Sequence, residues 1–215
     1  MKLLKDISDD DLLYLIKQSY VNGVRQNEAA WILYRGMYKE SSFNIFYISA
    51  EEFFKCLQLL DYYVKKKNNI GVTGNELEDL AKLFVFHVFK IEKGKIISVE
   101  ITKQKRLFVS RQGQHRFSRE EGEKEKKKEV NRMNRYSSDE LFDIKNESIY
   151  VGFKEKTDEK ISPIDKFHFE YPNIAMLFIS NMRDKASFEM SKIFSKKEID
   201  ELLEYKFYIG SKHTD

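Results

Sequence analysis

The sequence predicts a mainly α-helical protein, in which an N-terminal bundle of antiparallel helices precedes a smaller α+β region. Three observations support this fold class. The 215 residues include only 2 Pro and 9 Gly, which favours long helices over a turn-rich β fold. Apolar residues recur at spacings of three and four up to about residue 92, as on one face of a helix. After Gly94 this pattern gives way to β-branched residues and then to a highly charged segment.

The first two helices are expected in the first third of the chain. Ser8, followed by three aspartates, can cap the N-terminus of a helix that ends near Gly36, with an interruption or kink near Gly23. A second helix is expected from about Lys39 to Lys66. Its apolar stripe consists of Phe43, Phe46, Ala50, Phe53, Leu57 and Leu60.

A third helix is expected after the polar run KKKNNIGVTGN, from Gly74 to about Glu92. Its apolar stripe consists of Leu77, Leu80, Phe84, His87 and Ile91. Because the composition changes after Gly94, we divide the chain into a helical bundle, residues 1–93, and an α+β region, residues 94–215.

The α+β region is expected to begin with a β-hairpin over Lys95–Ser110, which is rich in β-branched residues. The segment from Arg116 to Arg135 is so charged that it is either a solvated helix or a mobile loop. The remaining predicted elements are short strands at Ile149–Lys154 and Lys166–Tyr171, a buried helix at Asn173–Met182, and a last helix opened by a capping box at Ser195–Glu198.

Composition also bears on the compartment. The single cysteine, Cys56, cannot form an internal disulfide, which favours a reducing compartment. The start, MKLLKDISDDD, has no apolar core of a signal peptide, and no run approaches the roughly 18 apolar residues of a membrane helix. We therefore expect a soluble cytoplasmic protein without a membrane partner. The formal net charge of +3 permits nucleic-acid contact without arguing for it.

Two carboxylates and a lysine are expected on one face of the second helix. Glu51 and Glu52 precede Lys55 by four and three residues, so both acids can reach the amine. A second apolar strip lies on the side of Glu52, which makes Glu52 the member expected to be buried. The simpler interpretation is an exposed ion pair within one helix, worth only a few tenths of a kcal/mol.

A histidine and a lysine mark the third helix. His87 lies on its apolar stripe, and Lys90 follows at three. A histidine in this position is often a satisfied core residue. If His87 lies beside Glu52, however, the carboxylate can hold the tautomer of a general base or acid. We therefore expect the two clusters to meet.

The order of these motifs resembles one known family. Asn27–Ala30, Tyr38, Ala50–Lys55 and His87–Lys90 together resemble the AbiV family of bacterial abortive-infection proteins, which has a HEPN-like helical domain. The resemblance covers about residues 10–92.

The resemblance implies phage defence, a homodimer and, as in many HEPN domains, RNA cleavage without a metal ion. The usual HEPN signature is an Arg, then four to six residues, then a His that acts on the ribose 2′-hydroxyl. Here Lys82 stands five positions before His87 in place of the Arg, and Lys55 or Lys90 would supply the positive charge instead. The catalytic group expected on this basis is His87, Glu52, Lys55, Lys90 and Glu51.

Additional cationic residues are candidates for RNA binding. Arg111, His115 and Arg116 flank Gly113, which would let the backbone approach a phosphate. Lys82 completes this predicted RNA-binding set. The alternative is a polar loop that leaves the hairpin.

We predict no metal and no cofactor, because two possible ligands, His168 and Glu170, are too few for a metal site. The function predicted from these features is that of an abortive-infection effector, a HEPN-type RNase that arrests infected cells. A phage-encoded protein would be its trigger. The alternative is a non-catalytic effector that engages a phage or host protein through the charged second half.

Overall fold

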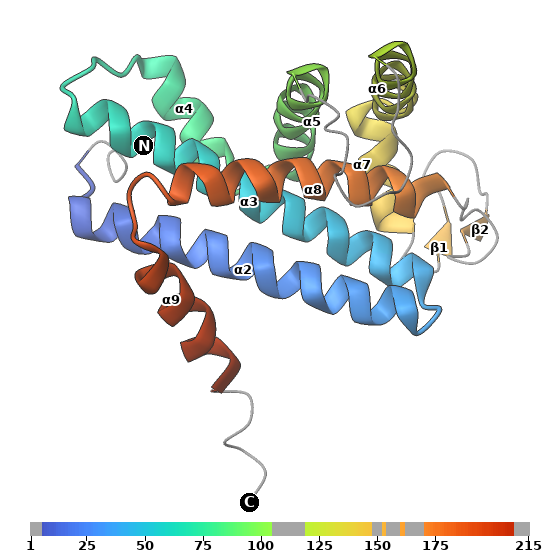
Figure 1. Cartoon of the computed structure of the whole chain (residues 1–215), viewed down its shortest axis with the longest axis horizontal. Coiled ribbons are helices and arrows are strands. Elements are labelled where there is room, and N and C mark those ends of the chain that lie inside the picture. Colours follow the sequence, from blue (N-terminus) through green and yellow to red (C-terminus); the bar gives the residue numbers. More distant parts are fainter. Residues whose placement is uncertain (1–5, 105–118, 148–151, 154–159, 162–169, 209–215) are drawn as a thin grey trace, which may run out of the picture.

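Helices make up nearly all of the computed structural model in Figure 1, which describes residues 6–104, 119–147, 152–153, 160–161 and 170–208. The elements in chain order are α2 (Asp9–Arg35), α3 (Lys39–Lys67), α4 (Gly74–Lys82), α5 (His87–Gln104), α6 (Arg119–Asn134), α7 (Ser138–Glu147), β1 (Gly152–Phe153), β2 (Lys160–Ile161), α8 (Glu170–Met190) and α9 (Lys196–Tyr208).

The long helix α3 forms the centre of the fold. It lies beside α2 along most of its length, and α8 runs along another side of it, while α5, α6 and α7 stand against this layer (Figure 1). Aromatic side chains of α3 fill much of the core, and five of the larger ones are almost completely buried: Phe43, Phe46, Tyr47, Phe53 and Phe54. Residues on nearly every side of α3 are therefore covered, which leaves its polar members dependent on internal partners.

The first helix follows the sequence prediction except at Gly23. The Ser8 side chain accepts a hydrogen bond from the Asp11 backbone N–H at 3.0 Å, as expected of an N-cap. The predicted interruption near Gly23 is wrong, because α2 continues through it. A Cβ at this position would lie 2.9 Å from the ring of Phe53, so the glycine lets α2 approach α3 closely.

The predicted third helix is two helices. α4 begins after Thr73, whose side chain and that of Glu76 form a capping box, and it ends at Lys82. Residues 83–86 form a turn, and α5 begins at His87 and continues to Gln104. His87 is therefore the first residue of a helix rather than a member of a buried stripe.

The hairpin predicted for Lys95–Ser110 is wrong, since residues 95–104 belong to α5. The β-branched residues there pack in helical conformation, because Val99 and Thr102 are buried at helical spacing. The amide of Asn181, on α8, donates to the hydroxyl of Thr102 at 2.9 Å. Packing against other helices thus overrides the local β propensity.

The predicted α+β character of the second region is also wrong. Among the described residues, the extended structure is limited to β1 and β2, which pair antiparallel over two residues each and are too short to form a sheet layer. At the second predicted strand, Lys166–Tyr171, Glu170 opens α8 instead, and residues 166–169 lie outside the described part of the chain. The capping box at Ser195 and Glu198 is confirmed, and α9 begins at the next residue, Lys196.

No helix in the described part of the chain is both long enough and apolar enough to cross a lipid bilayer.

Candidate functional site

Glu51 is the buried centre of a charged cluster. Its side chain is only 2% exposed, and three basic side chains surround it. One carboxylate oxygen, Oε2, lies 2.6 Å from His87 Nδ1 and 3.1 Å from Lys90 Nζ. The other, Oε1, lies 2.7 Å from Lys145 Nζ. The structure therefore brings together the acidic motif of α3 and the His87/Lys90 motif, as the sequence predicts, and adds a lysine from α7.

Three helices place these side chains. His87 and Lys90 are one turn apart in the first turn of α5, so both can reach a single carboxylate on α3. Helix α7 is fixed by Asn44, whose amide donates to the backbone carbonyl of Lys145 at 2.8 Å. Asn44 precedes Glu51 by two helical turns and lies on the same side of α3. The same face of α3 thus holds both the backbone and the ammonium group of Lys145.

The charge state of Glu51 follows from these contacts. Burial by itself raises the pKa of the carboxyl. The charges of Lys145 and Lys90 and the hydrogen bonds from Lys145 and His87 outweigh it, so the pKa of Glu51 lies below its usual value. Glu51 is consequently ionised at neutral pH.

The ionised carboxylate determines the tautomer of His87. A carboxylate only accepts hydrogen bonds, so Nδ1 must donate the proton in the 2.6 Å contact. In the neutral ring, Nε2 then carries the lone pair and can accept a proton from a ligand. The side chain is 49% exposed, and its ring stacks on that of Phe142 with the centroids 6.3 Å apart. His87 is therefore both fixed in orientation and accessible.

Two lysine ammonium groups lie at the Glu51 carboxylate beside His87. Lys90 and Lys145 contribute two ammonium groups and Glu51 one carboxylate, all of them buried. These ammonium groups lie in a low-dielectric setting beside the half-exposed ring of His87. Their charge therefore acts more strongly on a group that approaches the histidine than it would in water.

The position of Glu52 differs from the prediction. Glu52 was expected to be the buried acid beside His87, but Glu51 takes that place, and Glu52 bonds Lys55 at 2.7 Å. Both members of this second pair are 16% exposed, and the Lys55 ammonium lies 5.8 Å from the ring centre of Phe84. The Glu52/Lys55 pair is therefore separate from the Glu51 cluster.

The predicted RNA-binding residues are only partly described. Lys82 is the last residue of α4, where it contacts Glu78 and Asp79 and lies 5.7 Å from the ring centre of Phe89. These contacts direct its ammonium group to its own helix and to Phe89. The remaining members, Arg111, His115 and Arg116, lie outside the described residues.

Lys145 was not among the site residues expected from the sequence. No helix was predicted over Ser138–Glu147, and a single lysine in the segment DIKNE belongs to no recognisable motif. Once α7 is known, one signal exists: Lys145 follows the buried Leu141 by four residues and so lies on the inner face of its helix.

Among the residues that the structure describes, no group of three or more histidine, cysteine, aspartate or glutamate side chains is arranged to hold a metal ion.

Comparison with known proteins extends the resemblance noted from the motifs. A family model named HEPN_AbiV and described as AbiV matches residues 13–171, well over half of the chain. The match runs past the motif region and includes α5, α6 and α7, hence Lys145. No curated protein and no solved structure gave a match. The chain therefore belongs to the AbiV family of HEPN-like proteins.

Proposed function

We propose that this protein is an abortive-infection effector that cleaves RNA without a metal ion and so arrests translation and growth of phage-infected cells. One observation carries the proposal: His87 is held through Nδ1 by a buried, ionised Glu51, while its side chain is 49% exposed. Family membership supports the role in abortive infection. The reaction and its site are inferred from the geometry.

In the proposed reaction, Nε2 of His87 takes the proton of a ribose 2′-hydroxyl, and that oxygen attacks the adjacent phosphorus. The bond from phosphorus to the 5′-oxygen breaks, and the leaving oxygen takes a proton from solvent water. The products are a 2′,3′-cyclic phosphate and a free 5′-hydroxyl. Glu51 stabilises the imidazolium formed at His87, and this supports a role in general base catalysis.

Cations would stabilise the charge that develops on the phosphate oxygens. Lys90 and Lys145 supply the positive charge of the cluster behind His87. In this proposal Lys55 contacts the substrate from the separate Glu52/Lys55 pair, while Lys82, Arg111, His115 and Arg116 bind the RNA chain.

A homodimer is part of the proposal. The turn before His87 exposes three consecutive apolar residues, Phe84, Val85 and Phe86, at 45%, 66% and 57%. Exposed apolar surface of this kind is typical of a protein contact. If two copies pair through this Phe84–Phe86 strip, their His87 residues come close to the interface, where both can face one RNA.

A second function is favoured by the burial of the cluster. Because Glu51, Lys90 and Lys145 are almost fully buried, they also suit a purely structural network that ties α3, α5 and α7 together. The protein would then act in the cytoplasm by binding a phage or host protein, with the charged helix α6 as the contact surface. A phage-encoded protein is the proposed trigger in both cases.

Replacement of His87 by Gln separates the two functions. If His87 is catalytic, the variant loses RNA cleavage and toxicity but stays folded. Its free energy of unfolding should fall by about 1–3 kcal/mol, because the change removes one hydrogen bond from the buried Glu51 carboxylate, which keeps Lys90 and Lys145 as partners. Total RNA is followed on gels beside urea unfolding of the same preparations. Lys103→Ala, at an exposed pair on α5, is the control. Intact RNA with the wild-type protein, or full toxicity of the variant, would contradict the catalytic function.

A further inference from the structure

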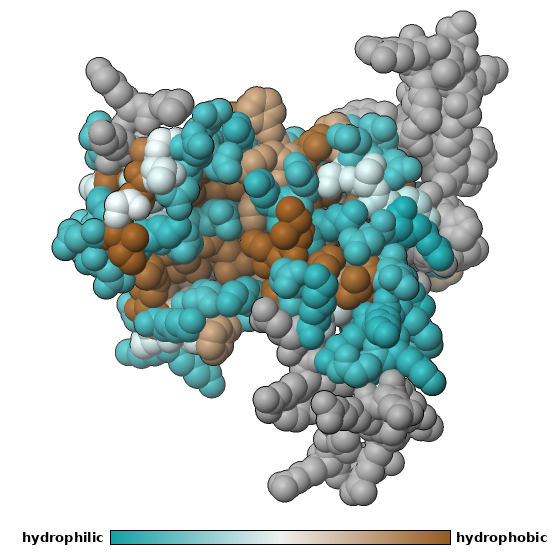
Figure 2. All heavy atoms as spheres, turned by 90° about the horizontal axis from the view of Figure 1, so that it is seen from above, coloured by the Kyte–Doolittle hydropathy of each residue, from teal (hydrophilic) through white to brown (hydrophobic). Residues whose placement is uncertain are grey.

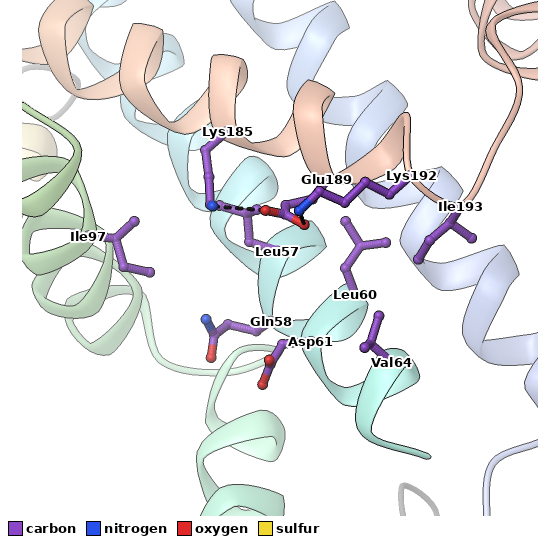
Figure 3. Close-up of a pocket in the computed structure, with 10 residues that line it drawn as sticks. All are labelled: Leu57, Gln58, Leu60, Asp61, Val64, Ile97, Lys185, Glu189, Lys192 and Ile193. Carbon is purple, nitrogen blue, oxygen red and sulfur yellow. Dashed lines mark hydrogen bonds and ion pairs between the residues drawn. The ribbon is translucent and has the colours of Figure 1, made fainter. Parts of the chain in front are cut away.

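Hydrophobic side chains lie between hydrophilic ones in the middle of the face seen in Figure 2. A groove of about 320 Å³, which we call the α3–α8 groove, is formed by three helices. Its lining residues come from α3, from α5, from the C-terminal end of α8 and from the turn that follows α8 (Figure 3): Leu57, Gln58, Leu60, Asp61, Val64, Ile97, Lys185, Glu189, Lys192 and Ile193.

One rim of the groove is cationic. Near the end of α8, Glu189 bonds the ammonium group of Lys185 at 2.8 Å through one oxygen, and through the other it bonds that of Lys192, in the turn after α8, at 2.8 Å. Two ammonium groups share one carboxylate, so among the described residues this rim has one more positive than negative charge. Each ammonium has further N–H groups available to an anion.

The opposite rim offers hydrogen-bond acceptors. Figure 3 shows the amide of Gln58 and the carboxylate of Asp61 extending from α3, across from the cationic rim. The Gln58 side chain makes no hydrogen bond to any residue that the structure describes. The ammonium group of Lys65 lies 2.8 Å from the carboxylate of Asp61 and 2.8 Å from that of Glu76. Two carboxylates thus share one ammonium group, which makes this rim negative.

An apolar floor separates the two rims. Leu57 and Leu60 on α3 are almost fully buried, and Ile97 on α5 is partly buried. A matching ligand is therefore anionic at one end, has an apolar face in the middle, and carries hydrogen-bond donors at the other end. The volume lies at the lower limit of the range for small-molecule sites, about 300 Å³ upward, which suits a ligand of mononucleotide size.

We propose that the α3–α8 groove binds a guanine nucleotide. Its phosphate would meet Lys185 and Lys192, and its base would lie on the apolar floor. Guanine presents two adjacent donors, N1–H and the N2 amino group, which fit the free oxygen of Asp61 and the carbonyl oxygen of Gln58. Adenine presents an acceptor at N1, which a carboxylate repels.

The nucleotide has two possible sources, a free nucleotide or a guanosine within an RNA chain. Gln58 follows Glu51 by seven residues on the same side of α3, about 10 Å along the helix axis. An RNA held at His87 could thus place a nearby guanosine in the groove. The chemistry of the groove is the same in both cases and does not depend on RNA cleavage.

Equilibrium dialysis of the full-length protein with guanosine monophosphate tests this proposal. We expect guanosine monophosphate to bind at one site per chain. Adenosine monophosphate, which lacks the two base donors, and guanosine, which lacks the phosphate, should each bind with at least about tenfold lower affinity. Asp61→Asn and the double variant Lys185→Ala/Lys192→Ala should each lower the affinity for guanosine monophosphate by at least about tenfold. Two matched controls, Asp184→Asn on the outer side of α8 and Lys197→Ala on α9, should change the affinity by less than about twofold.

No binding of guanosine monophosphate at about 1 mM would overturn the proposal, as would equal affinity for adenosine monophosphate or unchanged affinity in Asp61→Asn. A short RNA with a single guanosine distinguishes the sources, because it displaces the mononucleotide only if the groove accepts RNA. The same dialysis with His87→Gln should give wild-type affinity, so that failure of the catalytic proposal leaves this one standing.

Discussion

The ammonium group of Lys145 lies 2.7 Å from the carboxylate of Glu51, although the two residues are 94 positions apart in the chain. Glu51 is on α3 and Lys145 on α7, so the site is complete only when α7 is docked. The side-chain amide of Asn44, on the same face of α3, also donates to the backbone carbonyl of Lys145. The second half of the chain therefore contributes directly to the charge environment of His87.

Lys145→Ala should destabilise the protein by about 1–3 kcal/mol, because it removes a charged hydrogen bond from a buried carboxylate that keeps Lys90 as a partner. Urea unfolding measures this change. Lys103→Ala, which breaks an exposed pair within α5, should cost less than about 1 kcal/mol. Lys145→Arg should retain more stability than the alanine variant. Equal stabilities of the Lys145 and Lys103 alanine variants would mean that α7 does not hold Lys145 against Glu51.

Glu51→Gln and Glu52→Gln should behave differently, even though the two residues are adjacent. The first leaves two buried ammonium groups without their carboxylate and should cost about 3–5 kcal/mol. The second removes a partly exposed pair with Lys55 and should cost no more than about 1 kcal/mol. Thermal and urea unfolding of both variants measure the difference. The reverse order would place Glu52 at the centre of the cluster.

Stability should fall at acidic pH because of Glu51. Its pKa is below the usual 4.5 in the folded protein, so the unfolded chain takes up the proton first. The stabilising contribution is present above about pH 4.5 and is lost as the pH falls towards the folded pKa. The pKa of Glu76 is lowered to about 2, chiefly by its hydrogen bond with Lys65, but this contribution is the same in the wild type and in Glu51→Gln. The variant should therefore show a shallower loss of stability between about pH 5 and pH 3.

The first two helices could be predicted because a cap and the spacing of apolar residues are features of one contiguous segment. The charged residues of the Glu51–Lys55 and His87/Lys90 motifs could be found for the same reason, because each motif lies within a few residues of the chain. The same signals did not distinguish Glu51 from Glu52. Adjacent positions on a helix differ by about 100°, and which one faces α5 and α7 depends on how those helices pack.

The wrong prediction of a hairpin after Gly94 has a physical cause. The segment after Gly94 is rich in β-branched residues, and a strand is its local preference. In the folded chain Val99 and Thr102 are buried against other helices, and Ser98 accepts a hydrogen bond from Asn181. These partners are 79 and more residues away, so no local pattern could indicate them.

The Phe84–Phe86 strip should control self-association. Replacement of Phe84 and Phe86 by Ser should convert the proposed dimer to a monomer, because the change places hydroxyls in an apolar contact. Sedimentation velocity measures the mass. Phe188→Ser removes an equally exposed aromatic ring from α8 and should leave the mass unchanged. A wild-type protein that is monomeric at all concentrations would remove the dimer from the proposed mechanism.

Gly94 tests the close packing of α5 on α8. A Cβ at this position would lie 2.9 Å from Cζ of Phe178, closer than side chains tolerate. Gly94→Ala should cost about 1–3 kcal/mol through overpacking, even though alanine favours a helix by about 1 kcal/mol. Phe178→Leu in the same chain should recover part of this loss by opening space. Gly74→Ala, where nothing lies within 4 Å, should alter stability by less than about 1 kcal/mol. If the two alanine variants unfold at the same urea concentration, α5 does not approach α8 as closely as 2.9 Å at Gly94. The position of α5, and with it that of His87 at its first residue, would then differ from the structure described above.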